Sequence, residues 1–345
     1  MTKIKLTATG DVLLHSRIYD ISKKNGKYDF RDKMAPAKKL LHGSDISIVN
    51  LESIVAGEEM GLSSFPAFNN PVELVENLKE FGTDIVTNSN NHTLDLGEAG
   101  ALKSLENIEK AGLMYVGSHK SKADQEKVRI IEKNGIKCAF LSYTAVTLGN
   151  NPPKGKEYLL NRVLKGSTKS VRRVIEKIKK EDSPDVVIVS MHFGREYPLL
   201  PVAAQTEVAN SLSDAGADII IGHHPHVLQP AEWILNSRGK KSFVIYSLGN
   251  FYSGQKGLYR QIGGTISLDI VKNSSKKGDI TIKNPTLDLT FVDANRKSKY
   301  QMHNFLKYIE SNPYIKTDHG EFDSLEVYSE IATRFKQWMP EIKIQ

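Results

Sequence analysis

The chain has 345 residues, a length that allows one large domain or two ordinary ones. Hydrophobic residues make up 39% and charged residues 25%, which is typical of a folded globular protein and excludes a disordered or fibrous chain. The net charge of +7 favours anionic partners, whereas the lack of a recognition motif or of aromatic interleaving argues against nucleic acid.

The first residues lead directly into a strand-like segment at 4–9, with no apolar stretch and no small-residue cleavage site of a secretory signal. No apolar run reaches the roughly 18 residues of a transmembrane helix. We therefore expect a cytoplasmic chain; a cell-surface location would require an N-terminal anchor that this sequence does not contain. The single cysteine, Cys138, excludes an intramolecular disulfide and a thiolate metal site, and its apolar neighbours predict a buried strand residue.

Short β-branched runs then alternate with helical patterns as far as about residue 250, which predicts an α/β protein. The predicted strands are 4–9, 46–49, 84–87, 136–142, 186–190, 218–221 and 243–247. The predicted helices between them are 71–81, 98–111, 171–180 and 203–215. Gly82, Gly112 and Gly216 directly follow three of these helices, at the position where a left-handed residue ends a helix.

The pattern changes after about residue 262. Apolar segments at 264–271 and 280–292, joined by a polar turn at 273–278, predict an antiparallel hairpin. Residues 296–345 carry an amphipathic helical pattern. We expect one compact domain over 1–295, with a helical extension over 296–345 packed on it. The basic residues between Lys154 and Lys180 indicate either a solvated helix face or a rim that steers a polyanionic substrate.

Polar side chains follow five of the predicted strands, at the point where each strand ends. They are Asp11, then Asn50 and Glu52, then Asn90, Asn91 and His92, then His192 with Glu196, and finally His223, His224 and His226. A single residue of this kind is usually part of a turn or a cap. Five such positions together indicate a site, because open α/β sheets place their sites at the carboxyl ends of their strands.

The side chains at these strand ends suit divalent metal ions. Carboxylate and amide oxygens with imidazole nitrogens, and no sulfur, favour Mn, Fe or Zn. About six ligands exceed the needs of one tetrahedral zinc and would suffice for two ions bridged by a carboxylate and a water. Such a centre produces hydroxide at neutral pH, so no Ser or Cys nucleophile is required, and no nucleophile elbow, P-loop or triad is found in the sequence.

The motifs around these residues resemble those of the CapA family, the bacterial poly-γ-glutamate capsule biosynthesis proteins within the calcineurin-like metallophosphoesterase superfamily. They are Gly10-Asp11-Val12-Leu13-Leu14, Asn50-Leu51-Glu52, Asn90-Asn91-His92 with Asp95 and Gly97, His192-Phe193-Gly194-Arg195-Glu196-Tyr197, Gly222-His223-His224-Pro225-His226-Val227 and Tyr246-Ser247-Leu248-Gly249-Asn250-Phe251. The resemblance covers residues 10–251. It implies a four-layer α/β/β/α sandwich of the metallophosphoesterase type, with two metal ions at one edge of two sheets.

Carried over by motif, the resemblance implies a set of metal ligands and makes His92 the proton donor to the leaving oxygen. The implied ligands are Asp11, Glu52, Asn91, His192, His224 and His226. Two positions depart from the superfamily pattern. Leu13 stands where a histidine is usual, with His15 two residues too late, and Glu52 stands where an aspartate is usual.

Further residues are expected to contact the ligands or the substrate: His223, Asn50, Asn90, Asp95, Arg195, Glu196 and Asn250. Several of these positions have a second interpretation. Asp95 fits the ordering of its own loop, and Glu196 fits an ion pair with Arg195. His223 follows the leading glycine of its motif, whereas His224 keeps the one-residue spacing to His226, which favours His224 as the ligand.

Two functional hypotheses follow. The first is a metal-dependent hydrolase of the phosphoesterase type that acts on an anionic substrate through a hydroxide bound to two metal ions. The second is an accessory protein, non-catalytic or polymer-cleaving, that binds poly-γ-glutamate in capsule synthesis or export together with capsule synthesis proteins. The sequence names neither the substrate nor the metal.

Overall fold

Two β-sheets face each other in the computed structural model, which describes residues 1–164, 166–273, 280–294 and 299–345. The larger sheet has the strand order β16-β15-β14-β1-β4-β5-β6, with β13 beside β1 and β19 beside β15. Its strands are β1 Thr2–Leu13, β4 Ile46–Leu51, β5 Ile85–Thr87, β6 Met114–Val116, β13 Asn250–Ser253, β14 Ile262–Lys272, β15 Ile280–Asp293, β16 Gln301–Asn304 and β19 Lys343–Ile344.

The smaller sheet has six strands in the order β11-β12-β10-β9-β8-β7. They are β7 Arg129–Lys133, β8 Ile136–Thr144, β9 Val186–His192, β10 Ile219–His223, β11 Leu228–Leu235 and β12 Lys241–Leu248. Strands β8, β9, β10 and β12 run parallel to one another, as β1, β4, β5 and β6 do in the larger sheet. Each sheet therefore collects the carboxyl ends of its parallel strands at one edge.

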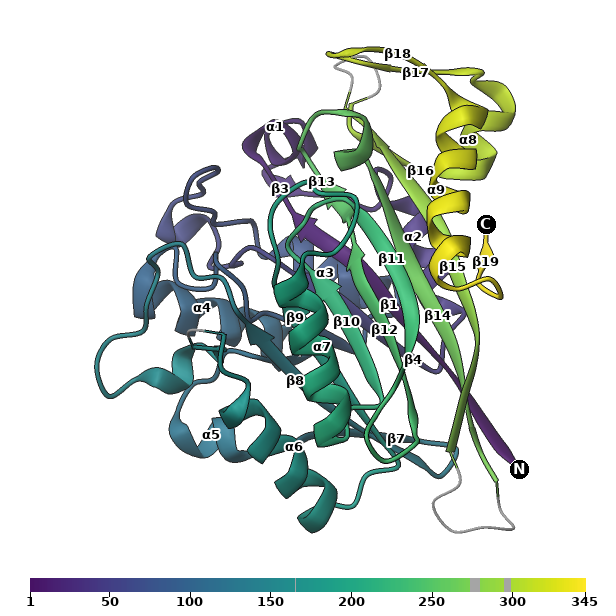
Figure 1. Cartoon of the computed structure of the whole chain (residues 1–345). Helices are drawn as coiled ribbons and strands as arrows, with labels where there is room; N and C mark the ends of the chain where they lie inside the picture. The colour runs from purple at the N-terminus through teal and green to yellow at the C-terminus, as the bar shows by residue number, and fades with distance from the viewer. Residues whose placement is uncertain (165, 274–279, 295–298) are drawn as a thin grey trace.

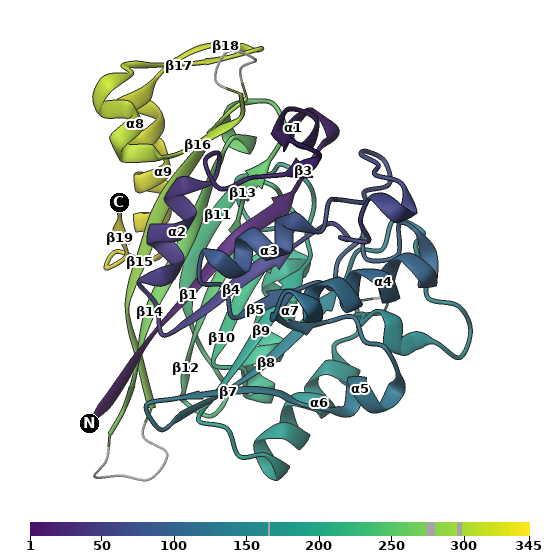
Figure 2. The ribbon, with the colours of Figure 1, turned by 180° about the vertical axis from the view of Figure 1, so that it is seen from behind.

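Helices cover the outer face of each sheet. Figure 1 shows α6 (Lys169–Glu181) and α7 (Ala203–Ala215) in front of the smaller sheet. Figure 2, seen from behind, shows α2 (Ala35–His42), α3 (Glu73–Glu80) and α4 (Gly97–Lys110) over the larger one. The result is the predicted four-layer α/β/β/α sandwich. Short elements complete this part of the chain: α1 Ser16–Tyr19, β2 Lys23–Lys24, β3 Lys27–Tyr28 and α5 Lys122–Glu126.

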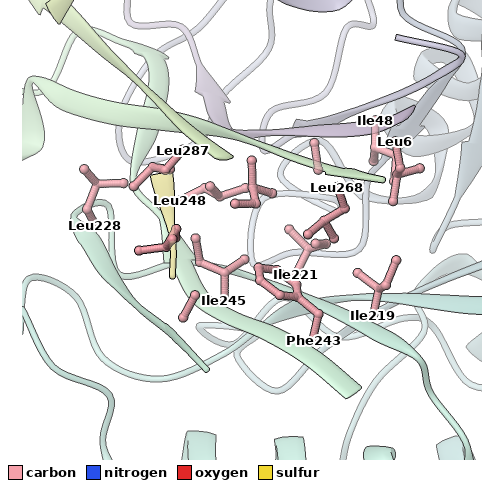
Figure 3. Close-up of a cluster of buried hydrophobic side chains, with 14 of the residues drawn as sticks. Leu6, Ile48, Ile219, Ile221, Leu228, Phe243, Ile245, Leu248, Leu268 and Leu287 are labelled. Carbon is pink, nitrogen blue, oxygen red and sulfur yellow. The ribbon is translucent and has the colours of Figure 1, made fainter. Parts of the chain in front are cut away.

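The main hydrophobic core lies between the two sheets. Leu6, Ile48 and Leu268 of the larger sheet face Ile221 and Phe243 of the smaller one (Figure 3), and all five are at most 3% exposed. Strands that are apolar on both faces form this layer, because helices cover their other side. Cys138 lies in the same core, as predicted, and burial raises the pKa of its thiol to about 12.

The predicted strands and helices all appear, with shifted ends. The first strand continues to Leu13, so that Asp11 lies inside it rather than after it. Helix α7 ends at Gly216, which adopts a left-handed φ of 112° and donates its N–H to the carbonyls of Leu212 and Ser213. This is the predicted role of a glycine at a helix end. Among the described residues, no helix is both long and apolar enough to cross a membrane.

The predicted hairpin is formed by β14 and β15, which pair antiparallel from Ile262 to Lys272. Most of its predicted turn (273–278), and the predicted domain boundary after residue 295, lie outside the described residues. The C-terminal segment contains the expected helices α8 (Phe305–Ser311) and α9 (Ser324–Trp338). It also contains strands: β16 and β19 extend the larger sheet, and β17 (Tyr314–Thr317) pairs with β18 (Gly320–Asp323).

Candidate metal centre

The carboxyl end of β1 lies between β4 and β13 of the larger sheet, and each of these three strands brings a polar side chain. Asp11 is paired in register with Asn50 of β4 and with Asn250 of β13. The Asn50 amide donates to Asp11 Oδ1 at 2.8 Å, and His223 Nδ1 of the smaller sheet lies 3.0 Å from the same oxygen. Asp11 Oδ2 lies 3.2 Å from His226 Nδ1. Burial alone would raise the pKa of Asp11, but the contacts with His223 and His226 outweigh it and hold that pKa well below its usual range.

Glu52 follows β4 and points into the space between the sheets. Its Oε1 lies 3.5 Å from His226 Nε2 and 3.6 Å from His192 Nε2, yet neither of its oxygens has a hydrogen-bond partner among the described residues. The side chain is completely buried. Burial, and then the neighbouring carboxylate of Asp11, raise the pKa of Glu52 well above its usual range.

The smaller sheet supplies the imidazoles. His192, at the end of β9, is paired in register with His223, at the end of β10. His192 Nε2 lies 2.6 Å from the Asn91 side-chain oxygen, and its ring centroid lies 4.7 Å from that of His224. Burial lowers the pKa of His192 well below its usual range and that of His224 to about 4. Both rings are therefore neutral at physiological pH, which is the state that binds metal.

Three groups of side chains have ligand atoms within 4.8 Å of one another: Glu52 with His192 and His224, Asp11 with Glu52 and His226, and Glu196 with His224 and His226. Glu52 belongs to the first two groups, and His226 to the last two. A carboxylate that belongs to two ligand groups, as Glu52 does, is in the position of one that would bridge two ions.

The donor atoms of this cluster fit divalent cations. Five of them are buried without a hydrogen-bond partner among the described residues: Asp11 Oδ2, both carboxylate oxygens of Glu52, His192 Nδ1 and His224 Nδ1. Buried polar atoms of native proteins normally have a partner, so several orphaned atoms in one cluster indicate a missing ligand. Carboxylate oxygen with neutral imidazole nitrogen is the donor set of Mn, Fe and Zn.

The His92 ring lies beside this cluster and is fixed by a carboxylate. His92 Nδ1 is 2.8 Å from Asp95 Oδ2, and the Phe68 ring packs edge-on against the imidazole at 4.7 Å. Asp95 also accepts the Phe68 N–H and the side-chain amide of Asn150. Because Asp95 accepts the Nδ1 proton, Nε2 is the ring nitrogen that remains available to another group.

The loop after β10 has an unusual backbone. His224 and His226 have φ values of 98° and 58°, and Tyr197 on the adjoining loop has a φ of 82°. These conformations are costly for residues other than glycine. The Tyr197 N–H donates to the Pro225 carbonyl at 2.9 Å and ties the two loops together. Strain concentrated in this way indicates that the surrounding structure fixes the direction of both imidazoles.

The remaining residues predicted for the site have different positions. His223 contacts Asp11 and belongs to none of the three groups, whereas His224 belongs to two of them. Asn250 holds His226 Nδ1 at 3.0 Å. The Asn90 side chain is a brace, because it donates to the Leu51 carbonyl and accepts the His92 N–H.

Other residues lie outside the cluster. Arg195 is exposed and has no ion pair with Glu196 within the described part of the chain. His15 is buried against Phe68, Leu13 is also buried, and neither belongs to a metal-binding group.

Sequence reasoning missed four residues around the site. Phe68 and Asn150 hold the pair formed by His92 and Asp95. Tyr197 lies beside His226, and Arg260 is stacked on Tyr197. Tyr197 stands inside the motif that begins at His192, which was a usable signal. The other three lie in loops whose course depends on tertiary contacts, so no local pattern marks them.

The sequence of this chain is similar to those of known capsule synthesis proteins. A family model described as bacterial capsule synthesis protein PGA_cap matches residues 5–255. The chain is 33% identical over 214 residues to the PGA biosynthesis protein CapA of Bacillus subtilis (strain 168), an alignment that covers 61% of this chain and 53% of that protein. It is 30% identical over 261 residues to the capsule biosynthesis protein CapA of Bacillus anthracis, covering 73% of this chain and 60% of that protein.

The chain thus spans little more than half the length of these two relatives. A solved structure of a proposed 5′-nucleotidase from Staphylococcus aureus in complex with α-ketoglutarate has the same fold, with a TM-score of 0.50 at 15% identity, covering 83% of this chain and 54% of that one. The chain belongs to the CapA (PGA_cap) family of bacterial capsule synthesis proteins.

Proposed function

We propose that this protein is a metal-dependent hydrolase of the phosphoesterase type that uses two divalent ions. The ions would be held by Asp11, Glu52, Asn91, His192, His224 and His226, with Glu196 as an additional ligand from the open side. When bound, two such ions supply a hydroxide nucleophile at neutral pH by lowering the pKa of a coordinated water. Mn, Fe and Zn all suit the donor set.

The observation that carries the proposal is the state of Glu52. A completely buried carboxylate with no hydrogen-bond partner is among the most costly groups that a fold can contain, unless a cation compensates it. Glu52 lies between the imidazoles of His192 and His226, in two ligand groups at once.

In this proposal His92 is the general acid that protonates the leaving oxygen. Asp95 accepts the Nδ1 proton and fixes the orientation of the ring, so Nε2 would donate a proton to the leaving oxygen as the bond to it breaks. Phe68 covers one edge of the ring, and the His92 side chain is 9% exposed, which restricts water around the transferred proton.

A second candidate is an accessory role in which the same site binds poly-γ-glutamate. The names of the two Bacillus relatives favour it, and so does the net charge of +7. A polymer of carboxylates is an anion that both a metal centre and basic side chains attract. Capsule synthesis proteins would then be its partners.

The deciding experiment measures metal content and hydrolysis in the same samples. Untreated protein would be analysed for Mn, Fe and Zn, and then assayed on p-nitrophenyl phosphate, bis-p-nitrophenyl phosphate and poly-γ-glutamate. His92→Ala is expected to keep the metal and lose roughly 10²- to 10⁴-fold in kcat, whereas Asp11→Asn loses metal and activity together. His42→Ala, in α2, serves as the histidine control.

Protein that contains no metal and stays inert after addition of Mn or Zn would exclude the hydrolase. Binding of poly-γ-glutamate that is indifferent to a chelator and to neutralisation of the basic residues at 154–180 would count against the accessory role.

A further inference from the structure

Arg260 lies beside the candidate metal centre and is connected to it through one asparagine. It ends the short 3₁₀ turn Leu258–Arg260 that precedes β14. The Asn250 amide donates to the Arg260 carbonyl at 2.9 Å, while the oxygen of the same amide lies 3.0 Å from His226 Nδ1. The backbone of Arg260 and the His226 imidazole are therefore positioned by the same side chain.

The Arg260 guanidinium lies over an aromatic ring and close to a glycine. Its Cζ lies 4.9 Å from the centre of the Tyr197 ring, which in turn lies 6.5 Å from the His226 ring. Gly257 has a φ of 110°, and a Cβ built there would lie 2.6 Å from Arg260 Nη2. A side chain at residue 257 would therefore require the guanidinium to shift from this position.

No carboxylate lies within ion-pair distance of Arg260 in the part of the chain that the structure describes, although the residue is half-buried. The guanidinium also hydrogen-bonds the Tyr197 hydroxyl, which Glu196 contacts as well. A guanidinium has five N–H donors, so donors remain along its edge beside this bond. That edge matches two oxygens of a carboxylate or a phosphate. A fixed, partly desolvated arginine without an acidic partner beside a reaction centre has the properties of an anion receptor.

The segment that carries Arg260 is fastened to the C-terminal part of the chain. The Lys256 ammonium pairs with Asp318 in the turn between β17 and β18, and the Tyr259 hydroxyl contacts Glu330 of α9. The Gln255 side chain accepts from Asn250 at 3.0 Å. Contacts at residues 255, 256 and 259 leave Arg260 little freedom to move, so a ligand does not have to order it.

We infer that Arg260, stacked on Tyr197, forms an anion subsite next to the metal centre and selects substrates with a carboxylate or phosphate close to the group that reacts. The inference rests on the proposed function for the reaction itself, but the binding it describes does not need turnover. Carboxylates of poly-γ-glutamate and a second phosphate of a phosphoester share this chemistry.

The test compares paired substrates and one direct binding measurement. Metal-loaded protein would be assayed on phenyl phosphate and on 4-carboxyphenyl phosphate by release of inorganic phosphate, and titrated with fluorescein-labelled deca-γ-glutamate by anisotropy. Arg260→Gln is expected to lower kcat/KM for the carboxylated ester about ten-fold or more, with a loss below about three-fold for phenyl phosphate. It should weaken binding of deca-γ-glutamate by a similar factor of about ten.

Two further variants separate charge from position. Arg260→Lys keeps the charge without the planar fork and should restore only part of the loss. Tyr197→Ala removes the ring on which the guanidinium is stacked and should resemble Arg260→Gln. Arg173→Gln, an exposed arginine of α6, is the matched control.

Equal losses on both esters together with unchanged binding of deca-γ-glutamate would overturn the subsite and leave the hydrolase intact. If wild-type protein hydrolyses neither ester but binds deca-γ-glutamate in an Arg260-dependent way, the subsite stands and the hydrolase falls.

Discussion

Glu52 is expected to have opposite effects on stability in the metal-free and the metal-bound protein. Without a cation its carboxylate is buried with no hydrogen-bond partner among the described residues, and its pKa in the folded state is raised well above its usual value of 4.5. The folded state then binds more protons than the unfolded chain, so stability is present at low pH and is lost as pH rises above about 4.5. Near neutral pH, the residue proposed to bridge the metals therefore opposes folding of the metal-free chain.

This predicts an unusual mutational result. In protein treated with a chelator at pH 7, Glu52→Gln should unfold in urea with a free energy of unfolding about 1 kcal/mol or more higher than wild type, because a neutral amide costs less to bury than an unpaired carboxylate. The difference should disappear near pH 4, and the exposed Glu207→Gln should show none. A Glu52→Gln protein that is less stable than wild type under these conditions would contradict the role of burial assigned to Glu52.

At the residue scale the sequence is informative where a side chain immediately follows a strand. Asp11, Glu52 and His192 could be found in this way, because strand ends in parallel sheets meet at one edge. The contact between Asp95 and His92 could not, since it depends on how a loop folds back on itself. Arg260 has no local signal at all: its importance comes from Tyr197, which is 63 positions away in the printed sequence.

Among the elements, the strand that carries the histidine motif depends on a glycine. Gly222 lies in β10, and a Cβ built on it would be 2.0 Å from the Tyr246 carbonyl oxygen of β12. No side chain can be accommodated there without separating the two strands. This explains the glycine that precedes His223 in physical terms.

Gly222→Ala is accordingly expected to lower the free energy of unfolding by about 1–3 kcal/mol, the usual cost of overpacking. Because His224 and His226 follow this strand, metal content should fall as well. Urea denaturation and metal analysis would check both effects. Gly43→Ala is a fair control, since its Cβ would meet nothing closer than 3.5 Å; similar losses in both variants would show that tight packing at Gly222 is not the cause.

The elements of the α/β part could be predicted because their hydrophobic period is regular and their helices end on glycine. The strands of the C-terminal segment were harder to predict, since β16 and β19 are short and form only because β15 offers them a free edge.

The basic side chains around α6 form ion pairs with nearby acidic residues. Lys177 pairs with Glu181 of the same helix, and Lys179 pairs with Asp218. Such pairs are usual on a solvated helix face.

At the scale of the whole molecule, the candidate ligands come from both sheets. Asp11 and Glu52 belong to the larger sheet, and His192, His224 and His226 follow strands of the smaller one. A bound cation would therefore connect the two halves of the sandwich at one end of their shared core. Binding to the folded state alone stabilises it by mass action, by about 3 kcal/mol at a hundred-fold excess over Kd.

Removal of metal with a chelator should lower the Tm of wild-type protein by several degrees, and addition of Mn or Zn should restore it. In His226→Ala, which removes a member of two ligand groups, the shift should be much smaller. Differential scanning calorimetry would measure both. An equal shift in the two proteins would mean that the chelator acts on ions bound elsewhere.

The attachment of the 255–260 segment to the C-terminal part has a consequence for how selectivity can change. The family match ends at residue 255, whereas Arg260 and its supports at Asp318 and Glu330 lie beyond it. The candidate ligands therefore lie within the matched stretch together with Tyr197, whereas the guanidinium and its C-terminal supports lie beyond it. Replacement of the C-terminal segment would therefore be expected to change the substrate preference while every proposed metal ligand is kept.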